Sequence, residues 1–121
     1  DIIISKPGEE IVLNNVQFSN NSYELNEMSK NELDKLSNYL IKYNINIQIE
    51  GHTDSNGDSA LNLILSENRA KSTAQYVISK GIDENRISGV GKGENEPMIE
   101  CSGSCSNEDH RTNRRSEFII L

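Results

Sequence analysis

Short runs of apolar residues with a period of two predict four strands. The clearest is segment 45–50, where isoleucine alternates with a polar residue, as in a strand with one buried face. Segment 11–18 is also apolar, but its alternation changes phase at Asn14 and Asn15, which predicts a β-bulge there. Two further strands are expected over 87–90 and 115–121.

A helical period predicts a first helix after the first strand. Ser29 followed three residues later by Glu32 is the pattern of a capping box, so the helix is expected to begin at Ser29. It is expected to run to about residue 43. Its inner face would carry Leu33, Leu36, Leu40 and Tyr43.

A second helix is expected from residue 58 or 59 to about Lys80, because Asp58 and Ser59 are good N-caps and Gly81 is a typical helix stop. Its inner face would carry Ala70, Ala74, Val77 and Ile78. Residues 94–113 are expected to form a long loop. The order strand, helix, strand, helix, strand, loop, strand predicts an α/β (α+β) sandwich with a mixed four-stranded sheet and helices on one face. Residues 1–10 would be an entry segment and 11–121 one domain.

Charge excludes some classes of function. The chain of 121 residues has a net charge of −7, which argues against binding to nucleic acid or to an anionic membrane surface. Three arginines nevertheless fall close together, at positions 111, 114 and 115, and such a basic spot can hold an anionic group of a ligand. No apolar run is long enough to span a bilayer and no signal peptide is visible. We therefore expect the domain to come from a longer exported protein, with any membrane anchor N-terminal to it.

Two cysteines, Cys101 and Cys105, flank a Ser-Gly-Ser turn. In an exported protein a disulfide is the favoured state, and Gly103 lets the turn tighten enough for it. Free thiols and a metal site with His110 are the alternatives, although two sulfurs and one histidine make an incomplete tetrahedral set.

The candidate site follows the strand that ends near Gly51. Asp54 lies in the loop after it, where α/β sheets commonly bind ligands, and Asn62 and Arg69 are seven residues apart on the next helix. That spacing places these two within about 20° of the same helix face. A carboxylate and a guanidinium lining one pocket would suit a zwitterion, such as the head of an amino acid. The alternative is that Asp54 and Arg69 pair only with each other.

These residues also belong to a longer pattern that resembles the OmpA-like C-terminal domain, the family shared by peptidoglycan-associated lipoproteins and flagellar stator proteins. The resemblance extends from about Val12 to Leu121, and order and spacing both agree. The matching positions are Gly51-His52-Thr53-Asp54, Gly57, Asn62, Leu65-Ser66, Arg69-Ala70, Gly81, Arg86-Ile87, Gly91, Gly93-Glu94, Pro97 and Asn113-Arg114-Arg115.

The resemblance implies non-covalent binding of peptidoglycan, with no cofactor, no metal and no catalysis. Asp54 and Arg69 would clamp the diaminopimelate of the stem peptide, and Arg114 would reach the stem or the glycan. Further ligand contacts are expected from Asn62, Asn21 (or its neighbour Asn20), Thr53 and Leu63. The domain would lie in the periplasm and anchor an outer-membrane protein or lipoprotein to the cell wall.

Alternatives remain at this stage. The same module could serve a stator or secretion-system wall anchor that forms a homodimer. A wall hydrolase or metalloenzyme using His52 or His110 is disfavoured, because no partnered nucleophile is evident, and His52 is expected to be a hydrogen-bonded structural histidine. The glycine-rich run 89–93 lacks the spacing of a phosphate-binding loop and is expected to be a strand end that turns tightly.

Overall fold

The computed structural model describes residues 10–11, 18, 22–101 and 104–121, which form a sheet, three α-helices and one 3-10 turn. In chain order the elements are β1 (Glu10–Ile11), α1 (Glu27–Lys42), β2 (Ile47–His52), α2 (Ser59–Ser79), η1 (Glu84–Arg86), β3 (Ile87–Gly93), α3 (Asn107–Asn113) and β4 (Arg115–Ile120). None of the helices among these residues is both long and apolar enough to cross a membrane.

The sheet has the strand order β1-β4-β2-β3. β2 and β3 are parallel, because α2 crosses over between them, while β4 is antiparallel to β2 and to the two-residue β1. The mixed sheet of an α+β fold is thus confirmed, and three of its strands, β4, β2 and β3, have six or seven residues each. The predicted bulge at Asn14 and Asn15 lies outside the described residues.

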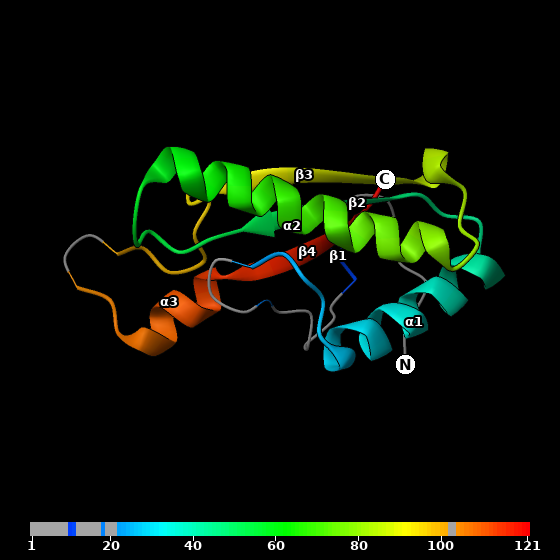
Figure 1. Ribbon diagram of the computed structural model, residues 1–121, viewed down its shortest axis with the longest axis horizontal. Helices are drawn as coiled ribbons and strands as arrows, with labels where there is room; N and C mark the ends of the chain where they lie inside the picture. Colours follow the sequence, from blue (N-terminus) through cyan, green and yellow to red (C-terminus); the bar gives the residue numbers. More distant parts are fainter. Residues whose placement is uncertain (1–9, 12–17, 19–21, 102–103) are drawn as a thin grey trace.

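The core lies between the sheet and the two long helices (Figure 1). Alternation in β2 buries Ile47 and Ile49 completely, as the period of two predicted. They share one core with residues of both helices. From α1 these are Leu33, Leu36 and Leu40, and from α2 Ala70, Ala74 and Val77. Helix α3 lies apart from α1, at the other end of the molecule, and leads directly into β4 (Figure 1).

Glycines on the helix-facing side of the sheet let α2 approach closely. A Cβ on Gly51 would meet the carbonyl oxygen of Ser66 at 2.4 Å, and one on Gly89 would meet the Ala70 backbone at 2.9 Å. Gly91 is equally crowded by Glu67. The prediction that the run 89–93 is a strand end that turns tightly is wrong, because these residues belong to the strand β3 itself. Its glycines leave room for α2 to pack closely against the strand.

The helix ends agree with prediction in α2 but not in α1. Asp58 caps α2 by accepting from the Leu61 N–H at 3.0 Å, and Gly81 follows it with φ 102°. The predicted start of α1 at Ser29 is wrong, because Asn26 is the N-cap and accepts from the Ser29 N–H at 2.8 Å. Ser29 is instead buried one turn inside the helix.

The long loop predicted over 94–113 is also wrong in its second half, where α3 forms. Its N-cap Ser106 and Asp109 make a reciprocal capping box, with both hydrogen bonds at 3.1 Å. This serine and aspartate are three residues apart in a polar stretch, and no apolar periodicity marks the helix. Asn113, the last residue of α3, is buried and leads the chain into Arg114.

Candidate functional site: a charged cavity at the end of strand β2

Asp54 lies in the loop after β2 and is nearly buried, with 10% of its side chain exposed. Its Oδ1 accepts from the Asn56 N–H at 3.0 Å, which orients the carboxylate. Its Oδ2 accepts a hydrogen bond from Arg114 at 2.5 Å. This ion pair joins the loop to the C-terminal end of α3. Arg114 is more exposed, at 42% of its side chain, so its guanidinium covers Asp54 from the solvent side.

Arg69 reaches the same place from α2. Its Nε donates to the Ser22 carbonyl at 2.8 Å, and its guanidinium lies 5.2 Å from the centroid of the Phe18 ring. Burial lowers the pKa of Arg69, and the like charge of Arg114 lowers it further, while Asp54 opposes both. Arg69 remains charged at pH 7, so a ligand anion beside it would be stabilised.

Asp54 and Arg69 line one cavity of about 470 Å³. The other lining residues are Phe18, Thr53, Asn56, Asn62, Leu65 and Arg114. The alternative reading, in which Asp54 pairs only with Arg69, does not fit, because among the described residues Asp54 forms its ion pair with Arg114. One acidic and two basic side chains therefore surround the cavity.

The remaining predicted site residues divide into three groups. Thr53 and Asn62 line the cavity, and the Asn62 amide donates to the carbonyls of Asp54 and Asn56 at 3.3 and 3.0 Å, which holds the loop in place. Leu63 is not among the residues that line it. Asn21 and Asn20 lie outside the described residues.

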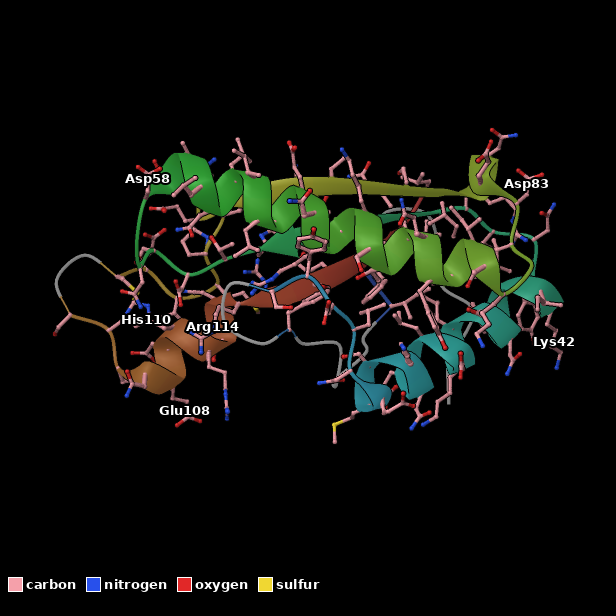
Figure 2. The ribbon with its side chains drawn as sticks, viewed as in Figure 1. Lys42, Asp58, Asp83, Glu108, His110 and Arg114 are labelled. Atoms are coloured by element: carbon pink, nitrogen blue, oxygen red, sulfur yellow. A yellow bond between two sulfur atoms is a disulfide. The ribbon has the colours of Figure 1, made fainter. Side chains whose placement is uncertain are left out.

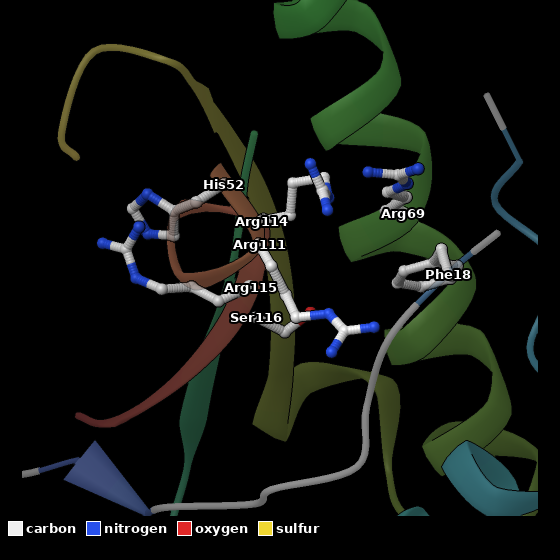
Figure 3. Close-up of a pocket in the computed structure, with 8 residues that line it drawn as sticks. Phe18, His52, Arg69, Arg111, Arg114, Arg115 and Ser116 are labelled. Atoms are coloured by element: carbon white, nitrogen blue, oxygen red, sulfur yellow. The ribbon is translucent and has the colours of Figure 1, made fainter. Parts of the chain in front are cut away.

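A second, smaller cavity of about 130 Å³ adjoins the first and shares Phe18, Arg69 and Arg114 with it (Figure 3). Arg111 and Arg115 add two more guanidinium groups to its lining. In Figure 2, Arg114 and His110 lie at the α3 end of the molecule, far from Lys42 at the end of α1. The basic spot expected from the sequence thus adjoins the Asp54 cavity.

The sequence alone did not single out Phe18, Asn56 and Leu65 as lining residues. Asn56 and Leu65 lie inside the recognised motif, and their neighbours were identified there. The contact between Phe18 and Arg69 joins residues 51 positions apart (69 minus 18), so no local pattern could have revealed it.

His52 differs from the expected hydrogen-bonded histidine. Its side chain is buried, yet neither ring nitrogen has a hydrogen-bond partner among the described residues. Burial lowers the pKa of His52, as does the charge of Arg115, while Glu117 and Glu50 act in the opposite direction. The imidazole is therefore neutral at pH 7.

Cys101 and Cys105 form the expected disulfide, with their Cα atoms 5.4 Å apart. The metal site with His110 is thereby excluded, since both sulfurs are bonded to each other. Asn113 holds the segment that precedes the disulfide, because its Oδ1 accepts from the N–H groups of Met98 and Ile99 at 2.9 and 3.0 Å. The segment that leads into the disulfide is therefore fastened to the last residue of α3.

Comparison with known proteins identifies the family. The model of the OmpA family matches residues 17–113, most of the chain. The chain belongs to the OmpA family. A peptidoglycan-associated lipoprotein of Buchnera aphidicola is 35% identical over 107 residues, which cover 88% of this chain and 60% of that protein. The OmpA-family chain thus spans little more than half the length of the curated relatives that it matches.

Solved structures share the fold of this OmpA-family domain. The crystal structure of the peptidoglycan-associated lipoprotein from Burkholderia pseudomallei superimposes with a TM-score of 0.79 at 24% identity, covering 88% of both chains. The periplasmic domain of Helicobacter pylori MotB also gives a TM-score of 0.79, at 21% identity, covering 98% of this chain and 79% of that one. At these identities the likeness extends to the fold alone.

Proposed function

We propose that this domain binds peptidoglycan non-covalently, through the diaminopimelate of the stem peptide. The observation that carries the proposal is the single cavity lined by Asp54 and Arg69. The free end of diaminopimelate has an ammonium and a carboxylate on one carbon. Asp54 would accept from the ammonium and Arg69 would donate to the carboxylate in bidentate fashion.

Ligand binding requires Arg114 to move. Its guanidinium lies 2.5 Å from Oδ2 of Asp54, where the ligand ammonium would bind. The Arg114 side chain is 42% exposed, so it can rotate toward solvent when the ammonium replaces it. The released guanidinium would then be available to the carboxylates of the stem or to the glycan. Two basic groups against one acidic group around the cavity favour a ligand with more carboxylates than ammonium groups.

The family supports the wider role. Relatives named peptidoglycan-associated lipoprotein and outer-membrane lipoprotein, together with porins of the outer membrane, carry the same domain. We infer that the domain is a binding module without catalysis, which lies in the periplasm and tethers an outer-membrane component to the wall. Each site would bind modestly, and many copies on a polymeric wall would make the attachment firm.

Sedimentation with purified peptidoglycan tests this proposal. Asp54→Ala and Arg69→Ala should each weaken binding by about 2 kcal/mol, roughly 30-fold, because each leaves a charge of the ligand unpaired. Glu108→Gln, which changes an exposed carboxylate on α3, is the matched control and should bind as the wild type does. Full retention by folded Asp54→Ala protein would contradict the assignment.

A second arm tests the specificity for diaminopimelate. Wall material in which lysine replaces diaminopimelate lacks the carboxylate that Arg69 would bind. Wild-type protein should bind such material at least 10-fold more weakly, and Arg69→Ala should bind both materials about equally. Equal binding of the two materials by the wild type would retain wall binding but exclude diaminopimelate as the recognised group.

A further inference from the structure

Three side chains that the proposed site does not use gather on the face of the sheet away from α1 and α2. Glu50 of β2 pairs directly with Glu117 of β4 in the strand register, and His52 lies two residues further along β2. The His52 Nε2 atom lies 3.5 Å from the Glu50 Oε1 atom and 3.9 Å from the Glu117 Oε2 atom. The three side chains are 1%, 15% and 20% exposed, in the order His52, Glu50, Glu117.

Two features of this cluster are unfavourable, although Arg115 pairs with one of the two carboxylates, that of Glu117. Like charges directly opposite each other on neighbouring strands repel. His52 is buried and faces the two carboxylates, but neither of its ring nitrogens has a hydrogen-bond partner among the described residues. A neutral imidazole with a free nitrogen and two carboxylates is the ligand set that a divalent transition metal prefers.

We propose that Glu50, His52 and Glu117 form a binding site for one divalent transition-metal ion such as Zn²⁺. One ligand atom from each residue lies within 4.8 Å of the others. Ligands about 2.1 Å from a tetrahedral ion are about 3.4 Å apart, so the spacings of 3.5 and 3.9 Å need only small adjustments. Water would complete the coordination.

Outer hydrogen bonds already orient the ligands. Gln48 donates to Oε2 of Glu50 at 3.0 Å, which leaves Oε1 directed at His52. Arg115 donates to Oε2 of Glu117 at 2.6 Å, so the ion would share this carboxylate with the arginine. The arginine is also a competing positive charge, so we expect moderate rather than tight binding.

The amino-acid sequence shows no local pattern of metal ligands at these three positions. Glu117 comes from the last strand, 65 positions after His52 (117 minus 52), and only the register of β4 beside β2 brings them together. The chain has two histidines, His52 and His110, so His110 supplies a matched control.

Calorimetric titration of the whole chain with Zn²⁺ at pH 7.5 tests the site. We expect one ion per chain with a Kd on the order of 1–10 µM, since three protein ligands and a competing arginine bind more weakly than a closed four-ligand site. Glu50→Gln should weaken binding at least 10-fold, and His110→Asn should leave it unchanged. Circular dichroism without metal checks that both variants are folded.

Nuclear magnetic resonance of the wild type gives a second readout that needs no variant. Ring resonances of His52 should shift on addition of Zn²⁺, while those of His110 stay in place. The proposal is overturned if about 100 µM Zn²⁺ produces neither heat nor a shift at His52. It is also overturned if binding persists in Glu50→Gln but is lost in His110→Asn.

Discussion

Two arginines, Arg86 and Arg69, show how the same type of side chain can have very different surroundings in one domain. Arg86 donates to the carbonyls of Leu40, Tyr43 and Ile45, at 2.8 to 3.2 Å, and so joins the end of α1 to the start of β2. Each of these acceptors is a neutral backbone group. The guanidinium therefore satisfies the open end of a helix, where carbonyls lack partners.

Arg69 has a different environment. Its Nε donates to the carbonyl of Ser22, and its side chain lines the cavity beside a carboxylate and a second guanidinium. Burial and the neighbouring Arg114 lower its pKa, while the charge of Asp54 acts in the opposite direction. Arg86 thus meets neutral backbone carbonyls, whereas Arg69 lies beside charged side chains that line a cavity.

The largest expected effect is the loss of stability when Arg86 is replaced. Arg86→Ala should lower the free energy of unfolding by about 3 kcal/mol, because three carbonyls lose a charged donor in a partly buried setting. Urea denaturation followed by circular dichroism measures this change. Below the melting temperature the variant should still bind peptidoglycan as the wild type does. A loss of stability under about 1 kcal/mol would remove the contrast between the two arginines.

The next largest effect is expected where α2, which carries Arg69, packs closely against the sheet. Gly51→Ala should cost about 2 kcal/mol of stability, since its Cβ would meet the Ser66 carbonyl oxygen at 2.4 Å and push α2 from the sheet. Wall binding should weaken as well, because Arg69 moves with the helix. Ser88→Ala on the exposed side of β3 is the control and should change neither property. An unchanged free energy of unfolding in Gly51→Ala would mean that α2 can shift away from the sheet without loss of stability.

A conservative exchange separates geometry from charge at the ligand-binding arginine. Arg69→Lys keeps the charge but loses the planar fork and the stacking on Phe18, so binding should weaken about 10-fold, or 1.4 kcal/mol. Lys71→Arg, on an exposed position of the same helix, should have no effect. Competition sedimentation with peptidoglycan measures both. Undiminished binding by Arg69→Lys would show that charge alone suffices at this position.

The smallest expected effect is a change in the pKa of Asp34, a carboxylate at the surface that can be compared with the buried charges of the site. Tyr76 donates to the Asp34 carboxylate at 2.6 Å, and this hydrogen bond is the largest cause that lowers the pKa of Asp34. The resulting stabilisation is present above the ordinary pKa of aspartate and is lost as pH falls through the lowered one. In Tyr76→Phe the pKa of Asp34 should rise toward its ordinary value, as carboxyl resonances in a pH titration would show. An unchanged pKa would assign the shift to Lys80, 3.4 Å away.

Local patterns predicted much of this domain correctly. The buried isoleucines of β2, the leucine face of α1 and the stop of α2 at Gly81 follow from short-range periodicity and backbone conformation. The capping box at Ser29 failed because Asn26 offered an equally good cap three residues earlier. Helix α3 escaped notice because a seven-residue helix has too few turns to show a period.

The sequence alone determined which residues face the core, the family to which the chain belongs and the charged residue types of the candidate site. Tertiary structure decided which charges meet, since Asp54 forms an ion pair with Arg114, and His52 lies near two carboxylates from different strands. The physical reason is the separation along the chain over which each interaction acts. Periodicity and capping act over a few residues, whereas an ion pair depends on strand register and helix packing, which bring together side chains that are sixty or more positions apart.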